Sequence, residues 1–125
     1  FIKKLVEITG VEVNGLRHFC FMYAKKDCFQ NCHIHNVSDK TLIVFIYFSK
    51  NWEDGDPGGT YMATEEDESK MIFEPYNLNN SIALFHDGPM AAHGVRYITK
   101  DVTRQGMQIM LEGYDEESKR WASDN

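Results

Sequence analysis

The sequence lacks the features that mark membrane-spanning and secreted proteins. Its longest apolar run covers only residues 42–48, whereas a membrane-spanning helix needs about 20 residues. The first ten residues, FIKKLVEITG, place charges inside any apolar segment and so do not form a signal peptide. The three cysteines are an odd and sparse set, unlike a disulfide framework. We therefore expect an intracellular, cytoplasmic protein with no membrane association.

An excess of positive charge is also missing. The 13 Lys and Arg residues stand against 19 Asp and Glu residues, which gives a formal net charge of −6 at pH 7. Proteins that hold nucleic acid through its phosphates present a basic face, so this balance disfavours nucleic acid as a partner. The 125 residues suffice for one domain with its own core. A single enzyme or ligand-binding domain remains, and the sequence carries no signal for an oligomeric state.

Short segments rich in β-branched and aromatic residues indicate an all-β fold. We expect strands at residues 16–23, 41–48, 59–63, 70–73, 81–85, 92–98 and 106–111. Turn-forming residues separate them, and this spacing is typical of a sandwich or barrel. The segment TLIVFIYF at 41–48 is apolar throughout, which predicts a central strand covered on both faces.

The two ends of the chain differ from this β pattern. Apolar residues at helical spacing predict a short helix within residues 1–10. We divide the single domain, 1–125, into an N-terminal flanking segment (1–15), a barrel core (16–112) and a tail (113–125). The tail is polar apart from Trp121, and we expect either a short helix that docks this side chain or a frayed end.

Three of the five histidines form a candidate metal site. His33 and His35 lie in the sequence CHIHN, and residues i and i+2 of an extended chain face the same side. His93 lies in AAHGV, on a different predicted strand. Two ligands from one strand and a third from a distant strand can form a facial metal site with open positions in a β-barrel.

Arg104 is the second candidate site residue, because it begins the last predicted strand, which is otherwise mostly apolar. A charged side chain in such a position needs a partner, and the planar guanidinium suits a carboxylate. The partner is either one of the many acidic residues at the surface or the carboxylate of a ligand.

Four segments, in order along the chain, resemble the Fe(II)/2-oxoglutarate-dependent oxygenases, in particular their small prolyl-hydroxylase-like branch. They are FCFMYAKKDCFQNCHIH, KTLIVFIYFSKNWEDGDPGGTYM, FEPYNLNNSIALFHDG and HGVRYITKDVTRQGMQIML, within residues 17–111. The resemblance implies a double-stranded β-helix, or jelly-roll, that uses Fe(II), 2-oxoglutarate as cosubstrate and O₂. It also implies hydroxylation of a small-molecule or peptide substrate at an amino-acid side chain.

The same resemblance assigns roles to single residues. It implies that His33 and His93 bind the metal, that Arg104 binds the far carboxylate of 2-oxoglutarate, and that Tyr23 hydrogen-bonds this carboxylate. The family has Asp or Glu two residues after the first His, where this sequence has His35. Either His35 completes a three-His site, or Asp39 replaces the acid, or the site is degenerate and binds little iron or another metal.

Three classes of function follow. The first is a 2-oxoglutarate-dependent dioxygenase with HxH in place of HxD. The second is a catalytically impaired pseudo-oxygenase or an interaction module. The third is a cupin-like three-His metal dioxygenase that does not use 2-oxoglutarate, and it would not need Arg104. Few residues precede the first matched strand, so we expect a barrel core that is trimmed at Phe1 or pared down.

Overall fold

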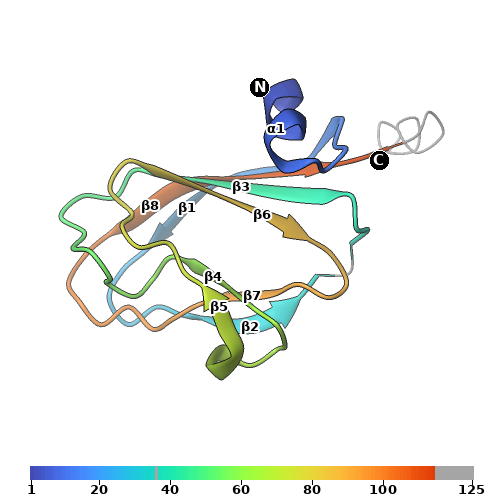
Figure 1. The fold of residues 1–125 in the computed structure, drawn as a ribbon. Helices are drawn as coiled ribbons and strands as arrows, with labels where there is room; N and C mark the ends of the chain where they lie inside the picture. Colours follow the sequence, from blue (N-terminus) through green and yellow to red (C-terminus); the bar gives the residue numbers. More distant parts are fainter. Residues whose placement is uncertain (36, 115–125) are drawn as a thin grey trace.

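The computed structural model describes residues 1–35 and 37–114, and it shows two facing antiparallel sheets with a short helix outside them (Figure 1). One sheet has the strand order β1-β8-β3-β6 and the other β2-β7-β4-β5. The elements are α1 (Ile2–Thr9), β1 (Gly15–Ala24), β2 (Gln30–Ile34), β3 (Thr41–Tyr47), β4 (Thr60–Ala63), the 3₁₀ turn η1 (Glu68–Lys70), β5 (Met71–Phe73), β6 (Ser81–Asp87), β7 (Ala92–Val95) and β8 (Arg104–Glu112). This arrangement confirms the predicted all-β jelly-roll.

Strand β3 is the centre of the first sheet, where it pairs with β6 on one side and β8 on the other. Its alternate residues point to opposite faces, and both faces are covered. Ile43 and Phe45 belong to the core between the sheets, whereas Leu42 and Val44 pack on the side of α1. The expected central strand is therefore confirmed.

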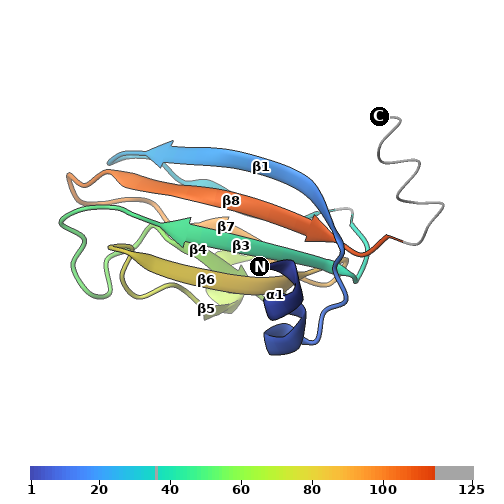
Figure 2. The ribbon, with the colours of Figure 1, turned by 90° about the horizontal axis from the view of Figure 1, so that it is seen from above.

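Helix α1 covers the outer face of the first sheet near β3 and β6 (Figure 2). It is amphipathic, and Leu5 is its buried residue. The helix ends at Gly10, whose φ of 73° is a left-handed conformation that favours glycine. The Gly10 N–H donates to the Val6 carbonyl at 2.9 Å. Val11 and Val13 then continue the same apolar cluster.

The strands differ from the sequence prediction in three places that matter for the site. Strand β2 (Gln30–Ile34) was not among the predicted ranges, because QNCHI is polar and has no apolar run. Strand β6 continues to Asp87 instead of ending at residue 85, and β7 ends at Val95 instead of residue 98. The tail, for which a short helix docking Trp121 or a frayed end was expected, lies outside the described residues from residue 115 on.

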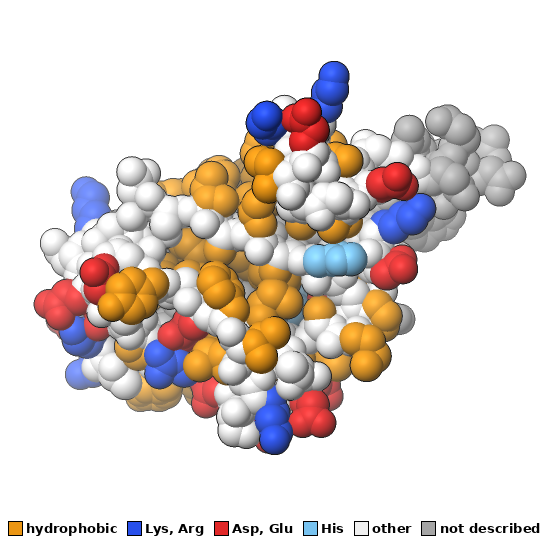
Figure 3. Space-filling view, in the orientation of Figure 1, with side chains coloured by type: hydrophobic (Ala, Val, Ile, Leu, Met, Phe, Trp, Pro, Cys, Tyr) orange, Lys and Arg blue, Asp and Glu red, His pale blue; other side chains and the backbone are white. Residues whose placement is uncertain are grey.

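The surface carries mixed charge. In Figure 3, Lys and Arg side chains are scattered among Asp and Glu, so this face has no continuous basic patch. Among the described residues, no helix is long and apolar enough to cross a membrane. The three cysteines, Cys20, Cys28 and Cys32, are free thiols.

Truncation of a β3 side chain tests this account of the core. Ile43→Ala removes a fully buried side chain from between the sheets, and we expect the free energy of unfolding to fall by about 2–5 kcal/mol. The matched control Ile82→Ala truncates a side chain that is 61% exposed, with an expected change within about 0.5 kcal/mol. Urea denaturation followed by tryptophan fluorescence measures both. Equal losses in the two variants would contradict the described core.

Candidate metal centre

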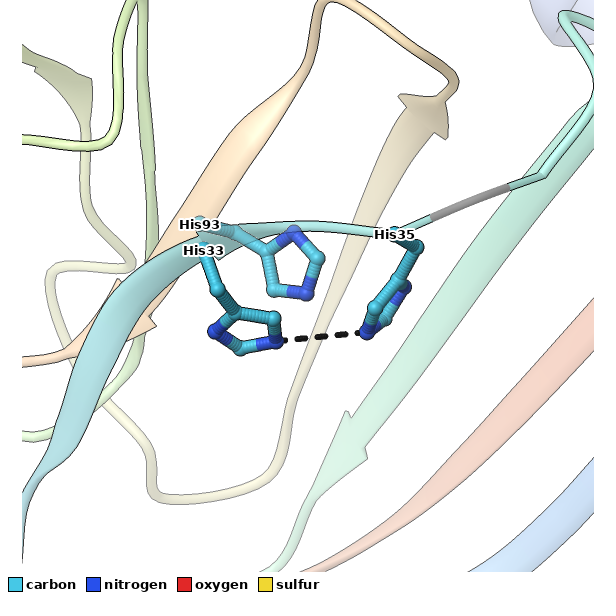
Figure 4. Close-up of side chains that lie close together, drawn as sticks. All are labelled: His33, His35 and His93. Carbon is cyan, nitrogen blue, oxygen red and sulfur yellow. Dashed lines mark hydrogen bonds between the residues drawn. The ribbon is translucent and has the colours of Figure 1, made fainter.

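Three histidines meet between the two sheets. His33 on β2 and His93 on β7 are direct partners in the antiparallel register, and His35 follows two residues after His33, on the same side of the chain. The ring centroids lie 4.3–5.0 Å apart. One ring nitrogen of each residue lies within 4.8 Å of those of the other two. Figure 4 shows the rings facing one another from neighbouring segments. The structure thus brings together the three predicted ligands.

The hydrogen bonds of His33 and His35 fix which nitrogens could bind a metal. Nδ1 of His33 lies 2.7 Å from the carbonyl oxygen of Asn31, and Nδ1 of His35 lies 2.8 Å from a carboxylate oxygen of Asp87. Both partners are acceptors, so each Nδ1 carries the hydrogen in the neutral ring. Each Nε2 then keeps its lone pair.

The two Nε2 atoms face each other at 3.2 Å (Figure 4). Two lone pairs in this arrangement repel, whereas a metal ion or a proton between them attracts both. Metal–imidazole bonds of about 2.1 Å at ordinary ligand angles separate two nitrogens by about 3.0–3.4 Å. The observed spacing of His33 and His35 therefore fits two ligands of one metal ion.

His93 is the most buried member of the cluster, with 3% of its surface exposed. Its Nδ1 is buried and has no hydrogen-bond partner among the described residues. Burial, followed by the nearby His35 and His33 rings, lowers the pKa of His93 to about 4. The ring is therefore neutral near pH 7 and offers a lone pair, as a metal ligand must.

Arg104 lines the same cavity, which has a volume of about 240 Å³. It is 6% exposed, and its guanidinium lies over the Tyr47 ring at 5.6 Å. Its Nε donates to the Gly58 carbonyl at 2.6 Å, and Nη2 donates to the Thr60 hydroxyl at 2.9 Å. Within residues 1–35 and 37–114 no acidic side chain forms an ion pair with it.

Asp39, the predicted substitute for a carboxylate ligand, does not lie with the histidines. Its side chain is exposed, and it lines a separate surface depression beside His86. The backbone carbonyl of Asp39 accepts a hydrogen bond from His86 Nε2. This hydrogen bond places the backbone of Asp39 at that depression and outside the cavity.

Tyr23 also lies outside the cavity. It is 62% exposed and borders a different depression, near Lys50. Its neighbours on β1, Met22 and Ala24, line the cavity instead, because successive residues of a strand point to opposite faces. Tyr23, the predicted partner of a ligand carboxylate, is therefore not among the residues that line this cavity. The tyrosine that lies against Arg104 is Tyr47.

Asp87 is the site residue that the sequence prediction missed. It is 1% exposed and lies at the end of β6. Besides His35, the Gly88 N–H donates to its carboxylate, at 2.9 Å. The only signal in the sequence is the Asp87-Gly88-Pro89 run shortly after an apolar segment, which equally suits an ordinary turn.

Comparisons with known proteins support the fold. A scan of protein-family models gives no match, and a search of curated proteins gives no significant match. Among solved structures, the chain is similar to a prolyl-4-hydroxylase from Pseudomonas putida, with a TM-score of 0.65 and 13% sequence identity. The match covers 91% of this chain and 61% of that structure. This chain therefore has the jelly-roll fold of a bacterial prolyl-4-hydroxylase, together with a three-His cluster.

The buried state of His93 predicts a pH dependence of stability in metal-free protein. The folded-state pKa of about 4 lies below the unfolded value of 6.5, so below pH 6.5 the unfolded chain binds a proton that the folded protein does not. Stability should fall from pH 6.5 to pH 4, by about 3 kcal/mol from this group. Urea denaturation at a series of pH values, with a chelator present, measures the slope.

The His93→Gln variant should lose this part of the slope, and the control His18→Gln, at an exposed position, should keep it. An unchanged slope in His93→Gln would contradict the assignment to His93.

Proposed function

We propose that this protein is a non-haem Fe(II)- and 2-oxoglutarate-dependent dioxygenase that hydroxylates an amino-acid or peptide side chain. One observation supports this more than any other. The guanidinium of Arg104, which is buried and has no carboxylate partner among the described residues, lines the same cavity as three converging imidazoles. A cosubstrate that chelates a metal at one end and carries a carboxylate at the other fits such a cavity.

The hydrogen bonds of Arg104 suit it to hold that far carboxylate. Gly58 and Thr60 fix the plane of the guanidinium through Nε and Nη2. The contact made by Nη1 is with the sulfur of Met22, at 3.7 Å, and a thioether is a weak acceptor. Strong donors therefore remain for a ligand, and the fixed plane lowers the entropic cost of binding it.

His33, His35 and His93 would hold the metal ion. When bound, Fe(II) supplies the activation of O₂ on which oxygenases of this kind rely. The protein residues orient the ligands and limit water. Asn31 and Asp87 fix the rings of His33 and His35, and Phe45 provides an apolar wall of the cavity.

The surroundings of the cavity suit a substrate larger than a single small molecule. A groove of about 540 Å³ adjoins the cavity, and Phe29, Gln30 and Val95 line both. The Phe29 ring stacks against Tyr97 at 6.2 Å and is 60% exposed. An amino-acid side chain can therefore approach the metal position across Phe29 while the rest of a peptide lies in the groove.

A second candidate function is a three-His metal dioxygenase that does not use 2-oxoglutarate. The presence of His35 in place of a carboxylate favours it, because three neutral imidazoles also hold metals in enzymes without a cosubstrate. Such an enzyme would not need the positive charge of Arg104 in its cavity. The two candidates therefore differ in what the loss of Arg104 does.

Anaerobic titration with Fe(II) and 2-oxoglutarate tests the proposal. We expect a visible absorption band from the chelate, and formation of succinate when O₂ is admitted. Arg104→Met removes the anion site and should weaken 2-oxoglutarate binding about 10- to 100-fold, because a charged hydrogen bond is lost. Binding of Fe(II) alone should stay unchanged.

The matched control is Arg96→Met. The Arg96 side chain pairs with Glu74 and does not line the cavity, so it should leave the 2-oxoglutarate affinity unchanged. If folded wild-type protein binds Fe(II) but gives no band at millimolar 2-oxoglutarate, the oxygenase proposal fails and the second candidate is favoured.

A further inference from the structure

Asp87 is a buried carboxylate at the end of β6. Its side chain has no exposed surface, and its described hydrogen-bond donors are His35 Nδ1 and Gly88 N–H. In the described part of the chain, no Lys or Arg forms an ion pair with it. A carboxylate removed from water normally requires a positive charge nearby.

His35 connects this carboxylate to the metal centre. Because Asp87 holds Nδ1 of the ring, Nε2 is turned toward His33, at 3.2 Å, and into the cluster. A cation bound at Nε2 would thus be separated from Asp87 by one imidazole ring. Carboxylate–histidine–metal arrangements of this kind fix the tautomer of the ligand and raise its basicity.

The positive charge that would gather at the metal centre makes a nearby carboxylate important. Three neutral imidazoles leave the full charge of a divalent cation uncompensated, and Arg104 adds another positive charge in the same cavity. An Asp or Glu ligand would remove one unit of that charge directly. Here a carboxylate is present, but it lies behind His35.

We propose that Asp87 is a positioning residue that supplies, through His35, the negative charge that a carboxylate ligand supplies directly at an HxD site. The inference rests on the proposed metal centre at His33, His35 and His93, but not on the use of 2-oxoglutarate. A purely structural role, in which Asp87 only caps the turn at Gly88, makes different predictions for metal affinity.

Titration with Co(II), with no cosubstrate present, provides the test. Asp87→Asn keeps the size of the side chain and removes its charge, and we expect Co(II) binding to weaken about 10- to 100-fold. The matched control Asp39→Asn makes the same change at an exposed position outside the cavity and should leave the affinity within about threefold of wild type. Visible absorption of bound Co(II) reports both affinity and ligand environment.

The same Asp87→Asn change made in a His35→Asp variant distinguishes a role in supplying charge from a purely structural role. In His35→Asp the introduced carboxylate takes the ligand position, and the buried Asp87 loses its donor. The same Asp87→Asn change should then leave Co(II) binding unchanged or strengthen it, so that the double variant H35D/D87N binds at least as tightly as H35D. A structural role for Asp87 would instead lower the affinity, or the thermal stability of the metal-free protein, by a similar factor in both backgrounds.

The outcomes are distinguishable from failure of the oxygenase proposal. Co(II) affinity of D87N within threefold of wild type, or an equal loss in both backgrounds, would overturn the role of Asp87. If D87N does not fold, weaker binding by H35D/D87N than by H35D would also overturn it. If the Co(II) affinities change as expected but no Fe(II)–2-oxoglutarate band appears, only the oxygenase proposal is rejected. If the wild-type protein does not bind Co(II), both the oxygenase proposal and the role of Asp87 are rejected.

Discussion

The pairing of β2 with β7 is the constraint on which the candidate site depends. It places His33 directly opposite His93 and, through the two-residue period of the chain, turns His35 toward them. Gly94 makes this close pairing possible, because a Cβ at this position would lie 2.8 Å from the Gln30 carbonyl oxygen and 2.7 Å from the Tyr61 hydroxyl oxygen. A slip of one residue in register would turn His33 to the opposite face and remove the cluster.

The two halves of the cavity come from different sheets. The histidine cluster comes from the β2-β7 side, whereas Arg104 begins β8 of the first sheet. Nη2 of Arg104 donates to the hydroxyl of Thr60 on β4, so the Arg104 side chain links the two sheets. The chain is acidic overall, yet this cavity combines a buried guanidinium with a three-histidine cluster. Inside a cavity, charges lie close to the ligand and are poorly screened, so the local charge decides which ligand binds there. The net charge of the chain acts mainly on the approach of the ligand.

The features that the sequence predicted correctly are those that follow from the alternation of side chains along an extended strand. The apolar segment 41–48 could only be a strand buried on both faces, and the HxH spacing placed His33 and His35 on one side of a chain. The resemblance gave Tyr23 its predicted role, but a shift of one position on a strand changes the face, and Met22 lines the cavity instead. Asp87 could not be predicted, because its partner His35 lies 52 residues away and only the pairing of distant strands brings them together.

The position of the carboxylate changes the character of the centre. A carboxylate oxygen bound to a metal lies about 2 Å from it, whereas one behind an imidazole lies about 6–7 Å away, so its direct Coulomb attraction is about one third as large. The Asp87–His35 pair therefore compensates the cation less than an Asp ligand would. A centre of three nitrogens with weaker compensation discriminates less in favour of hard cations, and its affinities should rise toward the later divalent metals. Under the proposed function, selection of Fe(II) would depend on metal availability and on an anion bound at Arg104, because a chelating dianion would supply the charge that the protein itself holds at a distance.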